Sequence, residues 1–485
     1  MLARRGVAAH LPAAAGVAAV FLAWAAASLM AGSYLVPAPW TSLADTAVLL
    51  SRSFPWSQIA ITLGRVVSGF CAGFAVGLIV GIAAGSRPEL GAFFRPIVQF
   101  FQGMPPLLWA IPLVALMGIG HLPAITVIAL ITFPLVAVTT GEGMTTLPRI
   151  YGEMLAVFAP GFRPRLRELI LPHLRPFLGA SLKAGLVLAV KASVTAEYFG
   201  AADGIGFQIQ SAYMSMRIRS LFAWAIVLIL MILAFTFLLP RISLLLRPVR
   251  RLLDRAHALP PRPSAPVAAI RAVSTAVPSR IVLRGVGFSW HRTEALIEGV
   301  NLSVPAGRVA VITGDSGVGK TTLIKIAAGL LRPSAGSASA PSRLGFVFQD
   351  DRLLPWRTIL DNAALPLLYA GHSRSEAHAI AGALLTEAGL GGAETRKPEE
   401  LSGGMRKRAA LARCFAGSPD AILMDEPFSG LHAEARRSLW AMVLRFLSLH
   451  PAPAIVVTHY PGELPPGPAC RLYTLAGKPA RLKGV

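Results

Sequence analysis

Hydrophobic and polar positions divide the chain into two halves of different character. In the first half, apolar residues form six runs, each close to the roughly 20 residues with which an α-helix crosses a bilayer. These runs lie at 13–36, 59–85, 94–118, 122–141, 177–199 and 220–245. In the second half, short apolar runs that predict strands at 281–288, 309–313, 344–348, 421–424 and 455–458 alternate with helical patterns. We therefore predict an all-α polytopic membrane domain of about six transmembrane helices, followed by an α/β domain.

Composition marks the boundary between these halves. Residues 256–279 are rich in proline, alanine and arginine, which is typical of an extended or flexible linker. The predicted domains are a membrane domain at 1–255, this linker, and an α/β domain at 280–485.

Charge is concentrated around the apolar runs. The formal net charge is +22, yet only 14% of the residues are charged and 54% are hydrophobic. Basic residues gather at 4–5, 87–95, 149–183 and 241–255, which six spans would place on one side of a membrane. Loops rich in Lys and Arg stay in the cytoplasm, so we expect the α/β domain there and the spans in the cytoplasmic (inner) membrane. This distribution argues against a nucleic acid as partner.

The first apolar run allows two interpretations. It follows Arg4 and Arg5, and it is long enough to be an uncleaved first span. A basic start before an apolar stretch is also the pattern of a cleaved signal peptide, so both interpretations stay open.

Two features interrupt the other runs. Glycine and proline at 103–106, and proline again at Pro112, are expected to break the third helix, either to line a cavity or to form a packing kink. Lys191 lies inside the fifth run, where a lysine at a helix centre costs roughly 2.5–3.5 kcal/mol. We expect Lys191 to face a solute pathway or a partner, for which Glu197 is a candidate. Snorkelling to the interface or a tie between helices are the alternatives.

A glycine-rich turn joins the apolar run at 309–313 to a helical pattern. Its spacing, Gly314-x-x-x-x-Gly319-Lys320-Thr321, is that of a phosphate-binding loop. Glycine lets main-chain N–H groups wrap phosphate oxygens, and the helix points its positive end at the same charge. Lys320 offers a cation to the β- and γ-phosphates, and the Thr321 hydroxyl can ligate Mg²⁺. The predicted nucleotide-binding residues of this loop are Gly314, Asp315, Ser316, Gly317, Val318, Gly319, Lys320, Thr321 and Thr322.

Two further motifs fit the chemistry of a bound nucleotide. The apolar run at 421–424 ends in Asp425 and Glu426, of which one can hold Mg²⁺ and the next can position or deprotonate water. The turn Ser402-Gly403-Gly404 opens a helical pattern and is a second candidate anion site. The predicted cofactors are ATP and Mg²⁺.

These motifs make residues 281–460 resemble the ATPase domain of an ABC transporter. The stretch 401–405, Leu-Ser-Gly-Gly-Met, resembles its signature sequence. The resemblance implies a catalytic set in which Glu426 is the base, His459 is the switch histidine and Lys320 holds the phosphates.

The resemblance extends to three other positions. It implies that Gln349 is the Q-loop glutamine and a further Mg²⁺ ligand, and that Trp290 stacks on adenine. His432 departs from the family, which usually has an aspartate there, and this leaves the contact across the dimer open.

The first half resembles the permeases of binding-protein-dependent importers. Their cytoplasmic loop carries Glu-Ala-Ala-x-x-x-Gly and then Leu-Pro, and here Glu153 and the Leu-Pro at 171–172 stand at matching spacing. The alanine and glycine positions are held by Met154, Leu155 and Ala159. Because the segment 153–172 has basic residues and a turn at Pro160-Gly161 and lies on the ATPase side, we expect it to dock near Gln349 as a short helix, with Glu153 and Ala159 serving coupling.

Three stretches resemble one group of importers, those for nitrate, sulfonates and taurine. Two lie in the membrane half, at 102–106 and at 191–206, and the third lies in the ATPase half, at 353–362. Both halves therefore indicate the same group.

The resemblance implies a fused permease and ATPase that works as a homodimer. Each ATP would lie between Lys320 of one copy and Ser402 of the other, and an extracytoplasmic binding protein would deliver a small anionic solute. Two alternatives remain, an exporter with the same domain order and a membrane-tethered ATPase that moves no solute. Short, closely spaced spans argue against the exporter, while Lys191 and Glu197 argue for a pathway. The sequence identifies neither the solute nor any second permease or ATPase chain.

Overall fold

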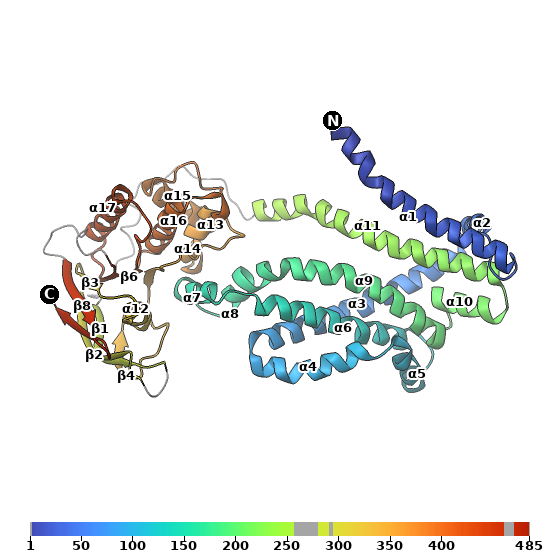
Figure 1. The fold of residues 1–485 in the computed structure, drawn as a ribbon, viewed down its shortest axis with the longest axis horizontal. Coiled ribbons are helices and arrows are strands. Elements are labelled where there is room, and N and C mark those ends of the chain that lie inside the picture. Colours follow the sequence, from blue (N-terminus) through green and yellow to red (C-terminus); the bar gives the residue numbers. More distant parts are fainter. Residues whose placement is uncertain (1, 257–279, 291–293, 460–469, 485) are drawn as a thin grey trace. The chain divides into compact units, whose positions relative to one another are not determined.

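The computed structural model describes residues 2–256, 280–290, 294–459 and 470–484 (Figure 1). The predicted linker lies outside the described residues except for Ala256. Contacts divide the chain into two compact units, one made of residues 1–147 and 173–250, the other of residues 148–172 and 251–485. The segment 148–172, which belongs to the first half of the sequence, therefore packs with the second unit.

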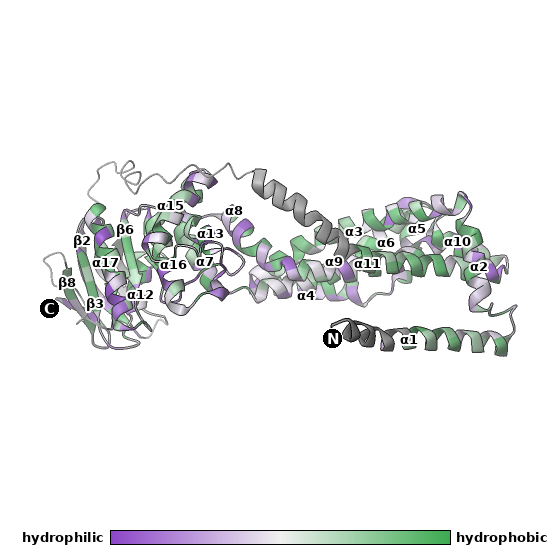
Figure 2. Cartoon of the chain, turned by 90° about the horizontal axis from the view of Figure 1, so that it is seen from above, coloured by the Kyte–Doolittle hydropathy of each residue, from purple (hydrophilic) through white to green (hydrophobic). Residues whose placement is uncertain are grey.

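The described part of the first unit is helical. Its helices are α1 (Leu2–Ala31), α2 (Pro39–Leu50), α3 (Phe54–Ser86), α4 (Pro88–Gly103), α5 (Pro106–Met117), α6 (His121–Thr145), α9 (Leu171–Gly200), α10 (Ile205–Met214) and α11 (Ile218–Ala256). A cluster of buried apolar side chains joins α3, α6 and α9. Figure 2 shows hydrophobic residues dominating α5 and α6.

Fewer spans are present among the described residues than the six expected. By length and composition, four helical stretches can cross a membrane, namely Phe54–Ser86, His121–Thr145, Phe162–Gly200 and Ile218–Leu238. The bent pair α4 and α5 makes a fifth if it is counted as one span. The first expected run contributes Ala15–Ala31, the apolar stretch at the end of α1.

Close packing of α3 against α6 follows from a glycine repeat. Glycine recurs at every fourth position of α3 from Gly69 to Gly85, which places all five on one face of the helix. A Cβ at Gly69 would lie 2.7 Å from the main-chain oxygen of Ile125, so no larger residue fits without moving a helix. Small residues at such spacing let helix backbones approach closely inside a membrane.

The third apolar run is broken where the sequence predicts, but only once. Helices α4 and α5 meet at a 92° bend between Gly103 and Pro106. Pro112, the second expected break, lies inside α5, which continues to Met117. One proline removes a single hydrogen bond, whereas the two consecutive prolines at 105–106 follow a residue that is held extended, Met104.

The second unit contains two sheets. An antiparallel sheet has the order β2-β1-β4 and consists of β1 (Arg280–Phe288), β2 (Ile297–Pro305) and β4 (Ala335–Ser339). A six-stranded sheet has the order β5-β6-β7-β3-β8-β9 and consists of β3 (Val309–Thr313), β5 (Leu344–Val347), β6 (Ala421–Asp425), β7 (Ala454–Val457), β8 (Cys470–Ala476) and β9 (Arg481–Gly484). Only β9 runs antiparallel in it. The five predicted strands are confirmed to within one residue at each end.

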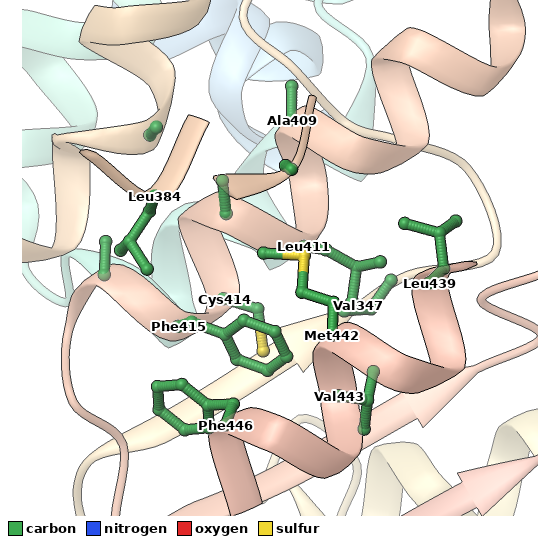
Figure 3. Packing of buried hydrophobic residues seen from close by; sticks show 14 of the residues in the cluster. Val347, Leu384, Ala409, Leu411, Cys414, Phe415, Leu439, Met442, Val443 and Phe446 are labelled. Atoms are coloured by element: carbon green, nitrogen blue, oxygen red, sulfur yellow. The ribbon is translucent and has the colours of Figure 1, made fainter. Parts of the chain in front are cut away.

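Helices surround these sheets. They are α7 (Arg149–Phe158), α8 (Phe162–Pro164), the π-helical η1 (Arg165–Ile170), α12 (Lys320–Ala327), α13 (Ile359–Ala363), α14 (Leu365–Tyr369), α15 (Arg374–Glu387), the 3₁₀ turn η3 (Pro398–Glu400), α16 (Gly403–Ala416) and α17 (Ala433–Leu449). Figure 3 shows how α16 is held in the core: Phe415 stacks on Phe446 of α17 at 4.2 Å, while Leu384 of α15 lies in the same cluster. Helix α16, which begins next to Ser402, is therefore firmly embedded.

Candidate functional site

The phosphate-binding loop lies between β3 and α12. Gly314, Gly317 and Gly319 have φ angles of 149°, 79° and 105°, which side chains rarely adopt, so these positions need glycine. The Lys320 Nζ donates to the main-chain oxygens of Gly314 (2.7 Å) and Asp315 (2.8 Å). Burial lowers the pKa of the Lys320 ammonium. The Lys320 ammonium therefore lies inside the loop that is predicted to hold phosphate. The other predicted residues of this loop are Ser316, Val318, Thr321 and Thr322.

The predicted magnesium ligands Thr321 and Asp425 are brought together. Asp425 ends β6, and the Thr321 Oγ1 donates to its Oδ1 over 3.2 Å. Burial raises the pKa of Asp425, an effect that the bond from Thr321 opposes. A hydroxyl and a carboxylate side by side are hard oxygen donors, which Mg²⁺ prefers, so these residues fit that ion.

Glu426 and His459 form a pair beside this loop. The His459 Nε2 lies 2.9 Å from Glu426 Oε1, and both side chains are partly accessible to water. Glu426 has a φ of 46°, a conformation that a non-glycine residue adopts only where the surroundings hold it. The predicted catalytic residues Lys320, Glu426 and His459 thus follow the strands β3, β6 and β7, whose carboxyl ends share one edge of the sheet.

The remaining predicted ATP contacts are exposed. Trp290 follows β1 with 64% of its surface accessible, and its ring lies nearly perpendicular to that of Phe288 at 5.0 Å. Gln349 comes just after β5, the strand that neighbours β6, and it is exposed.

A separate cleft of about 630 Å³ contains the signature turn. The Ser402 Oγ accepts from the Met405 N–H over 3.3 Å and so caps the start of α16. The described residues that line the cleft come from 349–351, 402–408 and 429–435, and they include Gly403, Gly404 and His432. None of them belongs to the phosphate-binding loop. Within the described chain, the phosphate-binding loop therefore does not line the cleft of the signature turn, whereas Gln349, also predicted to contact the nucleotide, does.

Helix α7 carries the predicted coupling residue Glu153. Its carboxylate bonds Arg352 over 2.7 Å and Lys325 over 3.1 Å. Lys325 lies in α12, directly after the phosphate-binding loop, and Arg352 lies three residues after Gln349. Burial tends to raise the pKa of Glu153, but the bonds from Arg352 and Lys325 outweigh it and the pKa is lowered.

The end of α7 is also covered. Ala159 is 1% exposed, which explains why a small residue stands there. The expected short helix near Gln349 is thus present, while the coupling roles of Glu153 and Ala159 stay predictions.

The structure corrects the proposed pairing of Lys191 with Glu197. Glu197 is fully buried, and it pairs with Arg65 of α3 over 3.0 Å instead. Its Oε2 also accepts from the hydroxyl of Thr62 (3.0 Å) and from the N–H of Gly206 (2.9 Å). Lys191 is exposed on α9, a helix that turns about 240° over six residues, so the two side chains point in different directions.

Arg65 is the functional candidate that the sequence analysis missed. It donates to the Asp203 carboxylate and main-chain oxygen and to His121 Nδ1, besides Glu197. The signal was available, because Arg65 is a charged residue inside the apolar run 59–85, as Lys191 is inside its own run.

Two family models match the chain. The one described as ABC transporter matches residues 297–429. The one described as binding-protein-dependent transport system inner membrane component matches residues 73–251. Both matches therefore fall on a single chain, one in each half.

Curated proteins are similar to the ATPase half. An aliphatic sulfonates import ATP-binding protein of Paraburkholderia xenovorans is 40% identical over 169 residues, which cover 35% of this chain and 66% of that protein. An uncharacterized ABC transporter ATP-binding protein of Bacillus subtilis is 40% identical over 184 residues, covering 36% and 71%. A taurine import ATP-binding protein of Pseudomonas syringae is 39% identical over 186 residues, covering 36% and 71%.

Proposed function

The chain belongs to the ABC transporter family, and on that premise we propose that it imports a small anionic solute of the sulfonate, taurine or nitrate type across the cytoplasmic membrane. It is an ATP hydrolase whose hydrolysis is coupled to transport. The observation that carries the proposal is that one chain matches both an importer's membrane component and ATPases named for sulfonate and taurine import. An extracytoplasmic substrate-binding protein would deliver the solute.

We propose a role in hydrolysis for each residue of the site, which its geometry supports. Mg²⁺, held by Thr321 and Asp425 with Gln349 as a further ligand, would neutralise charge on the phosphates. Lys320 binds the β- and γ-phosphates, and Glu426 accepts a proton from the attacking water. The His459 imidazole, 2.9 Å from that carboxylate, orients it.

A second copy of the chain would complete the site. The signature turn opens to a cleft of about 630 Å³ in which no residue of the phosphate-binding loop takes part. A helix N-terminus attracts anions, and in this chain nothing described supplies one to Ser402. In a homodimer, the nucleotide held by Lys320 of one copy would meet Ser402 of the other.

The test of import is uptake into proteoliposomes with ATP on the side of the ATPase and the binding protein on the other side. A labelled sulfonate should accumulate in the wild type. Glu426→Gln should still bind ATP, but it should show no uptake. Its ATP turnover should fall about 10²–10⁴-fold, because the positioned base is gone. The exposed Glu434→Gln in α17 is the matched control. Full hydrolysis without uptake of any sulfonate, taurine or nitrate would contradict import, and turnover of Glu426→Gln within threefold of wild type would contradict the catalytic role.

The test of the dimer mixes two inactive variants. Lys320→Ala removes the phosphate cation, and Ser402→Arg fills the signature turn, so each homodimer should be inactive. A mixed dimer would keep one intact composite site, and part of the hydrolysis should return. Activity that does not return on mixing, although mixed dimers are recovered by differential tags, argues against the shared site.

A further inference from the structure

The stretch 353–362 is the part of the ATPase half whose role the nucleotide site leaves unexplained. Trp356 and Arg357 of this stretch reach out of the ATPase fold to the same residue, Glu168 of η1. The Trp356 Nε1 donates to the Glu168 main-chain oxygen over 2.9 Å, while Arg357 forms an ion pair with its carboxylate. A third contact comes from the Tyr369 hydroxyl, which donates to Glu168 Oε1 over 2.8 Å. Three side chains thus recognise one residue of the permease segment.

The stretch is built to hold these side chains in place. Asn362 is fully buried, and its amide closes the turn: Oδ1 accepts from the Leu354 N–H over 2.7 Å, and Nδ2 donates to the oxygens of Leu354 (3.1 Å) and Thr358 (3.0 Å). Leu354 and Ile359 are fully buried on either side of the turn. Trp356 and Arg357 therefore project from a rigid turn, so binding orders few side chains.

The partner segment has a matching special feature. Residues 165–170 form a π-helical turn, a conformation that is rare and is frequently found at functional sites. Glu168 lies in that turn with only 7% of its side chain exposed. Tyr151 of α7 also meets Trp356 edge-on at 6.0 Å, so the indole contacts both helices of the segment.

This contact is separate from the one made by Glu153. Glu153 bonds Lys325 and Arg352, whereas Glu168 bonds Arg357 and Tyr369, and no ATPase residue is shared between the two acids. The Glu153 side chain is 37% exposed, so water and salt can screen it. Glu168 is enclosed, and an enclosed charge discriminates strongly against a wrong partner.

We propose that residues 353–362 form a permease-recognition site, which accepts a buried carboxylate from the cytoplasmic segment of the permease and rejects a neutral or basic residue there. In this chain the carboxylate is Glu168 of the same polypeptide. The site decides which permease segment the ATPase couples to, beyond the general docking that Glu153 provides.

The experiment exchanges the charges in the full-length chain and measures hydrogen–deuterium exchange in micelles, without any solute. Glu168→Arg alone and Arg357→Glu alone should each speed exchange about tenfold in peptides from 165–170 and 353–362, because like charges meet. The double variant should return both peptides to near the wild-type rate. The exposed pair Glu298 and Arg481, which joins two strands of the ATPase, is exchanged in the same way as the control and should leave these peptides unchanged.

Several outcomes decide the proposal. Unchanged exchange in the single variants, or failure of the double variant to recover, would overturn it. Faster exchange throughout β6 and β7 as well would indicate a general loss of fold and count against a local recognition site. Tyr369→Phe and Glu168→Gln are milder substitutions, because neither brings two like charges together. Both should speed exchange in residues 165–170, while peptides around Glu153 exchange at the wild-type rate. None of these readouts depends on import, so failure of the import proposal would be seen separately.

Discussion

Two buried arginines, one in each unit, have different hydrogen-bond partners. Arg65 in α3 is 2% exposed and meets the carboxylates of Glu197 and Asp203. Arg413 in α16 is fully buried, yet its hydrogen bonds go to two main-chain oxygens, those of Asp351 (2.9 Å) and Arg352 (2.7 Å). The first arginine is a partner in a charge network, whereas the second is a clamp on a stretch of backbone.

The clamp connects parts of the ATPase that are distant in sequence. Asp351 and Arg352 lie two and three residues after Gln349, the predicted Q-loop glutamine, and Arg413 lies near the end of the helix that begins at the signature turn. The Arg413 guanidinium also lies 5.0 Å from the ring of Phe158 in α7. Burial lowers the pKa of Arg413 to about 10, so it keeps its charge at neutral pH. A movement of α16 would therefore displace both the residues that follow Gln349 and helix α7.

The largest effect is expected from Arg65→Met. The variant would leave Glu197 buried without its cation, and breaking a buried ion pair in this way costs about 3–5 kcal/mol. Thermal unfolding of the purified full-length chain, together with its yield in membranes, measures this loss.

A second substitution sharpens that test. Adding Glu197→Gln to Arg65→Met removes the orphaned charge and should restore part of the stability, because the amide can still bond Thr62 and Gly206. If the double variant is less stable than Arg65→Met alone, the charge balance described above is not what Arg65 contributes.

A smaller effect is expected from Arg413→Met, because no carboxylate loses its partner. Two buried carbonyls would lose their donor, at about 1–3 kcal/mol for an unsatisfied buried group. The substitution should also lower ATP turnover more than ATP binding, since Gln349 is no longer fixed. Arg413→Lys is the control for charge: it keeps the cation but reaches only one of the two oxygens. Equal turnover in all three proteins would refute the clamp.

The sequence predicts the ATPase motifs better than the buried Arg65 network. The ATPase motifs are contiguous, so Gly314–Thr322 and Asp425-Glu426 could be placed on a loop and a strand end without knowing the fold. The Arg65 network joins residues 65, 121, 197 and 203, which only tertiary packing brings together, and no local spacing indicates it. The mistaken pairing of Lys191 with Glu197 arose because their distance along the chain was considered without their angle around the helix.

Docking of the segment 148–172 on the ATPase shows a related limit. Its Glu153 was predicted from a resemblance to a family motif, and the structure places it against Lys325 and Arg352. Glu168 matches no position of that motif, and its burial depends on a π-helical turn that no residue pattern in the segment indicates. Contacts made by residues of a known motif could therefore be predicted, whereas contacts that depend on irregular backbone could not.

The smallest effect on stability, and the most informative one for function, is expected from Lys191→Met. Lys191 is exposed on α9 about 13 Å before the end of that helix, and it lies inside an apolar run, where facing lipid is costly. A homodimer would resolve this cost, because a second copy could enclose Lys191 beside a water-filled passage for an anion. Stability and basal hydrolysis should then change little, as expected for a substitution without a buried partner, while uptake of a sulfonate in proteoliposomes should fall at least about tenfold. Lys183→Met, another exposed lysine of α9, is the matched control and should transport at the wild-type rate. Wild-type uptake by Lys191→Met would place this lysine outside the pathway. Among the described residues of the first unit, Arg65 would then be the only buried basic side chain to which an anion could bind.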